Sequence, residues 1–219
     1  KSKRQVRKII RDFKPDVAVG VGGYASAATL NAAYDLGIPC LIQEQNSFAG
    51  LTNKTLARKA RKICVAYEGM ERFFPADRIL LTGNPVRQNL SSPSSNKDEA
   101  CVHFSFNSNT PTVLLIGGSL GARTINQSIM AHLPELIDSG VQVIWQTGKN
   151  YYADCKAALD QLPHPNIICT DFVSQMPLAY ALADLVISRA GASSISELCL
   201  LGKASILVPS PNVAEDHQT

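Results

Sequence analysis

Hydrophobic positions along the chain alternate between short continuous runs and longer stretches with helical spacing. The short runs, rich in Val, Ile and Leu, predict strands at 16–20, 40–43, 63–66, 78–82, 112–116, 142–146, 166–169, 185–188 and 205–208. The longer stretches predict helices at 3–14, 25–36, 52–60, 122–137, 151–162, 175–182 and 193–201. Continuous apolar strands are typical of parallel sheets covered on both faces. The pattern therefore predicts a doubly wound α/β protein.

One polar segment interrupts this alternation. Residues 88–96 are rich in Ser, Asn and Pro, as linkers are, and a strand-like run restarts at Thr112. We therefore expect one domain over 1–88, a linker and lead-in over 89–110, and a second domain over 111–219. The chain opens directly on a helical pattern and stops soon after a predicted strand. We expect it to be an internal piece of a longer enzyme, with both domains truncated.

The charge is distributed unevenly between the two parts of the chain. The formal net charge is +3, but residues 1–62 hold 12 Lys and Arg against 4 Asp and Glu, while the remainder holds 9 against 14. A basic helix is usually a solvated surface, and an anionic membrane surface is the alternative. No aromatic stacking set or reading motif supports nucleic-acid binding. The six cysteines form no C-x-x-C pair, which favours reduced cysteines in the core.

Three glycine-containing turns each follow a predicted strand and open a predicted helix. They are 19–23, 116–122 and 188–194. Small residues allow a ligand to approach the backbone, and the N-terminus of the next helix offers N–H groups to an anion. Each turn could be only a tight connection, but three together indicate a phosphate-bearing ligand.

The first turn also satisfies a dinucleotide-binding pattern. Gly20, Gly22 and Ala25 match G-x-G-x-x-A, and Glu44 ends the next predicted strand. A nicotinamide-dependent dehydrogenase is therefore an alternative, although it leaves the other two turns unexplained. The sequence contains no P-loop pattern and no metal-spaced His and Cys cluster, so it requires no cofactor that we can identify and leaves a divalent-cation requirement undecided.

Five motifs together resemble the MurG family of bacterial glycosyltransferases. They are the runs at 22–26, 43–54, 83–87, 117–122 and 188–197, which occur in family order along the whole chain. The resemblance implies a GT-B fold, with two Rossmann-like domains facing a cleft. It also implies an inverting transfer of N-acetylglucosamine (GlcNAc) from UDP-GlcNAc to the 4-hydroxyl of N-acetylmuramic acid in lipid I. That enzyme would be peripheral, at the cytoplasmic face of the bacterial membrane, with its basic amino-terminal domain against the anionic inner leaflet.

The resemblance also assigns roles to individual residues. Ser119 would contact the diphosphate, the backbone of Val173 would recognise uracil, and Glu197 would accept hydrogen bonds from the ribose hydroxyls. The substrate-binding positions it implies are Asn46, Arg87, Ser119, Val173, Ala192, Ser193, Ser194, Ile195, Ser196, Glu197 and Gln218. The phosphate-turn glycines are Gly22, Gly23, Gly117, Gly118, Gly121 and Gly191.

These positions also have simpler interpretations. Glu197 could simply stabilise the N-terminus of its helix, Arg87 could form an ordinary interdomain ion pair, and Asn46 could cap the helix near 52–60. The histidine that the family uses near the acceptor would precede residue 1, so the catalytic base is unassigned and Glu44 is a weak candidate. We therefore expect the fragment alone to be inactive. The remaining alternatives are another UDP-sugar transferase or epimerase and a non-catalytic nucleotide- or membrane-binding module.

Overall fold

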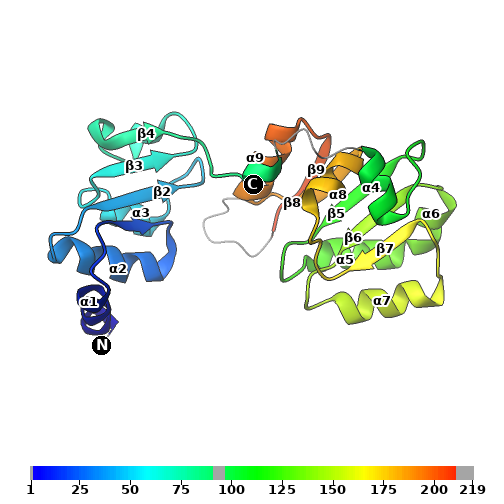
Figure 1. Cartoon of the computed structure of the whole chain (residues 1–219), viewed down its shortest axis with the longest axis horizontal. Coiled ribbons are helices and arrows are strands. Elements are labelled where there is room, and N and C mark those ends of the chain that lie inside the picture. The colour runs from blue at the N-terminus through cyan, green and yellow to red at the C-terminus, as the bar shows by residue number, and fades with distance from the viewer. Residues whose placement is uncertain (1, 91–96, 211–219) are drawn as a thin grey trace. The chain divides into compact units, whose positions relative to one another are not determined.

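The structure, a computed structural model, describes residues 2–90 and 97–210. The chain divides into two compact units, Lys1–Pro85 and Val86–Thr219, each built on a parallel sheet (Figure 1). All nine predicted strands are present, and helices occur in every predicted helical stretch. The units are Rossmann-like α/β domains, as the sequence predicted.

Unit 1 contains four parallel strands in the order β1-β2-β3-β4. The strands are β1 (Ala18–Gly20), β2 (Cys40–Glu44), β3 (Lys62–Val65) and β4 (Ile79–Leu81). The helices are α1 (Ser2–Phe13), α2 (Gly23–Asp35) and α3 (Leu51–Leu56), with short 3-10 turns η1 (Met70–Arg72) and η2 (Ala76–Arg78). The parallel register pairs Gly20 with Ile42 and Ile42 with Ile63.

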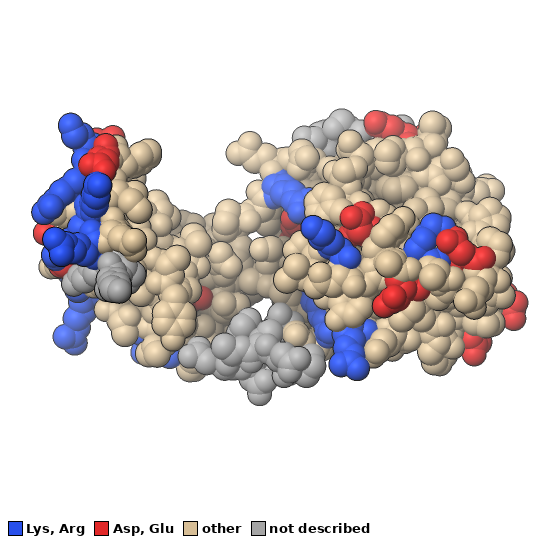
Figure 2. All heavy atoms as spheres, turned by 90° about the horizontal axis from the view of Figure 1, so that it is seen from below, with Lys and Arg blue, Asp and Glu red and all other residues tan. Residues whose placement is uncertain are grey.

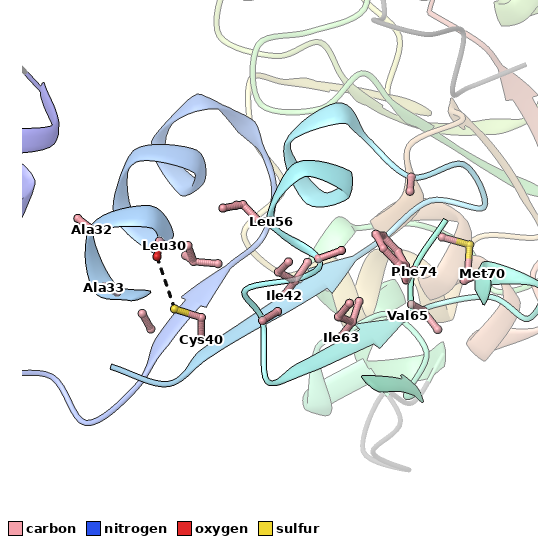
Figure 3. Packing of buried hydrophobic residues seen from close by; sticks show 14 of the residues in the cluster. Leu30, Ala32, Ala33, Cys40, Ile42, Leu56, Ile63, Val65, Met70 and Phe74 are labelled. Atoms are coloured by element: carbon pink, nitrogen blue, oxygen red, sulfur yellow. Dashed lines mark hydrogen bonds between the residues drawn. The ribbon is translucent and has the colours of Figure 1, made fainter. Parts of the chain in front are cut away.

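The core of unit 1 lies between this sheet and its helices. Ile42 and Ile63 are fully buried there, beside Leu30 of α2, Leu56 of α3 and Phe74 (Figure 3). The sequence predicted sheets covered on both faces, but among the described residues of unit 1 a packed core covers one face. Val19 of β1 is 57% exposed and Leu80 of β4 is 43% exposed.

Unit 2 contains five parallel strands in the order β7-β6-β5-β8-β9. The strands are β5 (Thr112–Ile116), β6 (Gln142–Gln146), β7 (Ile167–Thr170), β8 (Leu185–Arg189) and β9 (Ser205–Val208). The helices are α4 (Lys97–Phe104), α5 (Arg123–Ala131), α6 (Leu133–Asp138), α7 (Tyr152–Gln161), α8 (Met176–Leu182) and α9 (Ala192–Leu201), with the 3-10 turn η3 (Gln88–Leu90).

Helices cover both faces of the sheet in unit 2. Leu114 and Val186 point into a core with α4, α8 and α9, while Leu115 and Trp145 point into a second core with α5, α6 and α7. Figure 1 shows these two groups of helices on opposite faces of the sheet. The inward residues alternate along β5 because successive side chains of a strand point to opposite faces. Unit 2 is therefore doubly wound.

Two elements of unit 2 differ from the sequence prediction. The expected single helix over 122–137 is broken at His132 into α5 and α6, and Pro134 lies in the first turn of α6, where proline is tolerated. In addition, α4 forms within the segment expected to be linker and lead-in. This helix packs on α8 through Ala100, which is fully buried.

Candidate functional site

The strand order of unit 2 reverses between β5 and β8. β6 and β7 follow β5 on one side, and β8 and β9 lie on the other. In open parallel sheets, ligands bind at the carboxyl ends of the strands at such a switch point. The turns 117–122 and 190–191 leave β5 and β8 at this position. The topology therefore brings together the second and third glycine turns that the sequence singled out.

The turn after β5 requires glycine at particular positions. Gly118 and Gly121 have φ angles of 77° and 91°, and a Cβ on Gly117 would lie 2.8 Å from the backbone nitrogen of Ala122. Ser119 at its tip is exposed, and α5 begins at Arg123. The turn therefore presents a hydroxyl and a helix N-terminus at the switch point.

A further turn, after β6, supports the turn after β5. A Cβ on Gly148 would lie 2.1 Å from the nitrogen of Gly121, and the N–H of Lys149 donates to the Ser119 carbonyl at 3.1 Å. The sequence pattern did not single out residues 146–149, although Gly148, two residues after the end of a predicted strand, was a usable signal.

A buried hydrogen-bond chain fixes these two turns to each other. Asn126 of α5 is fully buried, and its amide donates to the Thr147 carbonyl at 2.8 Å. Its side-chain oxygen accepts from the indole N–H of Trp145 at 2.9 Å. Because the groups are buried and paired, these hydrogen bonds hold the start of α5 against the end of β6.

The turn after β8 leads directly into α9. Gly191 is the N-cap residue and contributes no side-chain cap, so the first-turn N–H groups of Ala192 and Ser193 lack intrahelical acceptors. The hydroxyl of Ser196 donates to the Ala192 carbonyl at 2.8 Å. Arg189, which the sequence left unassigned, donates to the carbonyls of Val208 and Pro209 and thus holds the end of β9.

The carboxylate of Glu197, in the second turn of α9, has two partners. The hydroxyl of Tyr180 donates to Oε2 at 3.0 Å, and Nε of Arg87 lies 3.4 Å from Oε1. Burial is the largest cause that raises the pKa of Tyr180, and the charge of Glu197 adds to it. Arg87 and Glu197 are thus brought together within unit 2. Arg87 does form an ion pair, but within unit 2 and not between domains as its simpler role would have it.

The other substrate-binding residues expected in unit 2 differ in their exposure. Val173 is 5% exposed and packs in the core beside Met176 and Tyr180, while the neighbouring Phe172 is 57% exposed. Ser194 and Ile195 are half-buried in the first turn of α9. Gln218 lies outside the described residues.

In unit 1, Glu44 organises the loop that carries Asn46. Its Oε1 accepts from the Asn46 N–H, and its Oε2 accepts from the Gly50 N–H, each at 3.1 Å. Asn53 also donates to Oε2, at 2.9 Å. Glu44 is 3% exposed, so its carboxylate is buried and its oxygens are occupied by donors from its own loop and helix. This arrangement favours a structural role over that of a general base.

The loop at 45–50 is also joined to the loop after β4. The amide of Gln43 donates to the Gly83 carbonyl at 3.4 Å, and Asn84 donates to the Gln45 carbonyl at 3.0 Å. Asn46 does not cap α3, because the N-cap residue of that helix is Gly50. Two of the five motifs are thus brought together at one edge of unit 1.

The first glycine turn has a packing explanation for one of its glycines. A Cβ on Gly20 would lie 2.8 Å from a methyl carbon of Leu30, so glycine here allows α2 to lie close to β1. Gly22 and Gly23 have φ angles of 92° and 76° and start α2. The dinucleotide pattern is therefore satisfied at Gly20 for reasons that require no ligand.

Basic side chains gather on one part of the surface of unit 1 (Figure 2), and α1 carries several of the Lys and Arg residues of this unit. Arg4, Lys8 and Arg11 are exposed, whereas Arg7 pairs with Asp35 of α2 at 2.6 Å. Ile10 of α1 is buried, but Ile9 is 63% and Phe13 78% exposed. No described helix is long and apolar enough to span a membrane. The described residues also contain no group of three or more His, Cys, Asp or Glu suited to a metal ion.

Comparison with protein families identifies both units. Residues 1–65 match the glycosyltransferase family 28 N-terminal domain, and residues 112–219 match the glycosyltransferase family 28 C-terminal domain. The two matches occur in family order and cover most of the chain.

Individual relatives agree with this result. The chain is 63% identical over 219 residues to the UDP-N-acetylglucosamine–N-acetylmuramyl-(pentapeptide) pyrophosphoryl-undecaprenol N-acetylglucosamine transferase of Parabacteroides distasonis, covering all of this chain and 60% of that protein. It is 60% identical to the enzyme of the same name from Phocaeicola vulgatus, covering all of this chain and 58% of that protein. The chain thus spans about 60% of the length of these curated relatives.

Solved structures are similar in fold. The crystal structure of Acinetobacter baumannii MurG superposes with a TM-score of 0.70 at 31% identity, covering 99% of this chain and 58% of that one. The UDP-GlcNAc 2-epimerase of Neisseria meningitidis, bound to UDP-GlcNAc, gives 0.68 at 17% identity, covering 94% of this chain and 62% of that one. At that identity, the second likeness establishes the fold alone.

Proposed function

Because the chain belongs to glycosyltransferase family 28, we propose that it carries the donor-binding part of an inverting N-acetylglucosaminyltransferase. The donor would be UDP-GlcNAc, and the acceptor would be the N-acetylmuramic acid 4-hydroxyl of lipid I, giving lipid II for peptidoglycan synthesis. The observation that carries this proposal is the convergence of the Ser119 turn, the α9 N-terminus and Glu197 at the switch point of unit 2.

The residues of unit 2 suit a nucleotide diphosphate leaving group. Negative charge develops on the diphosphate oxygens as the glycosidic bond breaks. The first-turn N–H groups of Ala192 and Ser193, the dipole of α9 and the exposed hydroxyl of Ser119 would stabilise that charge. The Glu197 carboxylate can accept hydrogen bonds from the two hydroxyl groups of a ribose diol.

Asn46 and Arg87 would complete the donor site, and Gln218 would contribute from beyond the described residues. An amide side chain can donate and accept hydrogen bonds at once, which suits sugar hydroxyls. The Arg87 guanidinium would place a positive charge beside the diphosphate. We propose that the 219-residue chain binds the donor but does not catalyse transfer, because none of the residues that the structure describes is placed as the base for the acceptor hydroxyl.

Calorimetry on the full chain tests donor binding. We expect UDP and UDP-GlcNAc to bind and NAD not to bind. Glu197→Gln should weaken UDP binding about tenfold, while the matched Lys156→Gln, on the exposed face of α7, should leave it unchanged. NAD binding without UDP binding would favour the dehydrogenase alternative, and conversion of UDP-GlcNAc to its 2-epimer would favour the epimerase.

We propose further that α1 places unit 1 against an anionic membrane surface at the cytoplasmic face. The combination of exposed Arg4, Lys8 and Arg11 with exposed Ile9 and Phe13 supports this orientation. Each basic residue near such a surface contributes at most about 1 kcal/mol. Hydrophobic side chains on the same helix would enter the headgroup region.

Vesicle sedimentation tests the membrane proposal. The chain should bind vesicles containing phosphatidylglycerol and release them as salt rises, with little binding to neutral vesicles. Reversing the charge of Lys8 and Arg11 together should abolish binding. Reversal of Lys97 and Lys156 in unit 2 removes the same formal charge and should have a smaller effect. Binding that ignores both lipid charge and salt contradicts the electrostatic part of the proposal.

A further inference from the structure

Tyr180 is a buried residue whose hydroxyl is directed at the proposed ribose-binding carboxylate. The residue is 2% exposed, and its ring packs in the core among Met176, Leu182 and Leu198. The hydroxyl donates to Oε2 of Glu197 at 3.0 Å. A tyrosine ring held by packing on all sides has few alternative rotamers, so its hydroxyl is a fixed donor.

The two oxygens of Glu197 have partners of different kinds. Oε2 accepts from the buried Tyr180, whereas Oε1 faces Nε of Arg87, whose side chain is 53% exposed. The Glu197 side chain is 11% exposed. The Oε2 side of the carboxylate thus faces the buried tyrosine, and the Oε1 side faces the half-exposed Arg87.

We infer that Tyr180 is a positioning residue that holds the Glu197 carboxylate with one oxygen turned toward the ribose hydroxyls of a uridine diphosphate ligand. This inference rests on the proposed function, because it presupposes that Glu197 binds ribose. A carboxylate fixed before binding loses less side-chain entropy when the diol arrives. Without the tyrosine hydroxyl, Oε2 lacks its buried donor, and the carboxylate can rotate toward Arg87 or solvent.

Tyr180→Phe removes the hydroxyl and keeps the ring in the core. The test compares its affinity for UDP with its affinity for 2′,3′-dideoxyuridine diphosphate, which lacks both ribose hydroxyls. Wild type should bind UDP the more tightly of the two. The variant should lose about tenfold in UDP affinity and change less than about twofold for the dideoxy ligand. A purely structural effect would weaken both ligands equally and would overturn the inference.

Glu197→Ala supplies the second arm of a double-mutant cycle. In that background, Tyr180→Phe should have no further effect on UDP affinity, because the group it positions is gone. Tyr152→Phe removes a hydroxyl from α7, outside this site, and should leave both affinities unchanged. An unaltered preference for UDP in Tyr180→Phe overturns the positioning role while leaving the proposed function intact. Failure of wild type to bind UDP contradicts the proposed function itself.

NMR of the wild-type protein gives an independent test that does not depend on whether any variant folds. The hydroxyl proton of Tyr180 should exchange slowly with solvent in the NMR spectrum and stay protected when UDP is added. Loss of that protection on UDP binding would mean that the ligand displaces Tyr180 from Glu197, which overturns the inference.

Discussion

The amide of Asn53 donates a 2.9 Å hydrogen bond to Oε2 of Glu44, and both side chains are 3% exposed. Asn53 belongs to α3, whereas Glu44 ends β2, so this contact joins the helix to the sheet. The same carboxylate accepts from the backbone of Asn46 and Gly50. A single buried charge thus fixes the start of α3 and the loop that carries a proposed donor-binding residue.

Asn53→Ala should lower the free energy of unfolding by about 2–3 kcal/mol, because it leaves a buried carboxylate short of one donor. Urea denaturation of the full chain measures this. Thr55→Ala in the same helix is the matched control. It removes an exposed hydrogen bond to the Thr52 carbonyl and should cost less than about 0.5 kcal/mol. Equal costs for the two variants would mean that the Asn53–Glu44 bond does not hold the loop.

Gly121→Ala should disrupt the turn after β5. Its φ is 91°, and a Cβ there would lie 2.3 Å from the Thr147 carbonyl oxygen, which belongs to the backbone and cannot easily move. We expect a loss of about 3 kcal/mol or more, from strain and from displacement of the β6 turn.

Gly118→Ala provides the comparison for that variant. Gly118 has a similar φ of 77°, but no described atom lies within 4 Å of the position that its Cβ would take. Gly118→Ala should therefore cost only the about 1 kcal/mol that a left-handed backbone costs an alanine. Thermal unfolding of both variants separates this backbone cost from the cost of the steric clash at Gly121. A similar cost at both positions would show that the contact between the two turns is not tight.

The pattern of apolar residues was sufficient to predict the strands, since each buried parallel strand is a continuous apolar run flanked by polar or glycine-containing turns. The break at His132 was missed because the apolar spacing continues through it, and the proline that follows is compatible with a first helical turn. α4 was missed because its apolar residues, such as Ala100, Cys101 and Val102, lie mostly in one short run and gave only a weak periodic signal beside a polar segment.

The candidate site was predictable only in part. Glycines after strands mark where the chain turns at the sheet edge, so the turns at Gly117–Gly121 and Gly191 could be selected. The pairing of Tyr180 with Glu197 joins residues 17 positions apart on two helices. The contact between Gly148 and Gly121 likewise depends on which strands are neighbours. Local sequence carries no information about either contact.

Arg87 and Glu197 should contribute differently to stability and to binding. Because the Arg87 side chain is 53% exposed, its ion pair is screened by solvent, and Arg87→Gln should change the free energy of unfolding by less than about 1 kcal/mol. UDP affinity should nevertheless fall about tenfold, and its dependence on salt should weaken, because a cation near the diphosphate is lost. Calorimetry at two salt concentrations measures the effect. An unchanged salt dependence would place Arg87 away from the diphosphate.

Cys155 should make the stability of unit 2 fall at alkaline pH. Burial, and next the negative charge of Asp154, raise the pKa of this fully buried thiol from 9.0 to about 11. The unfolded chain therefore loses the thiol proton at a lower pH than the folded chain does. The stabilisation that comes from this raised pKa is fully present below pH 9 and is lost as the pH rises from about 9 to 11, with a slope of about 1.4 kcal/mol per pH unit.

Urea denaturation across this range should show that the free energy of unfolding of Cys155→Ala depends less on pH than that of wild type. Cys199→Ala, at an exposed position, should keep the wild-type slope; parallel pH profiles for wild type and Cys155→Ala would contradict the assignment.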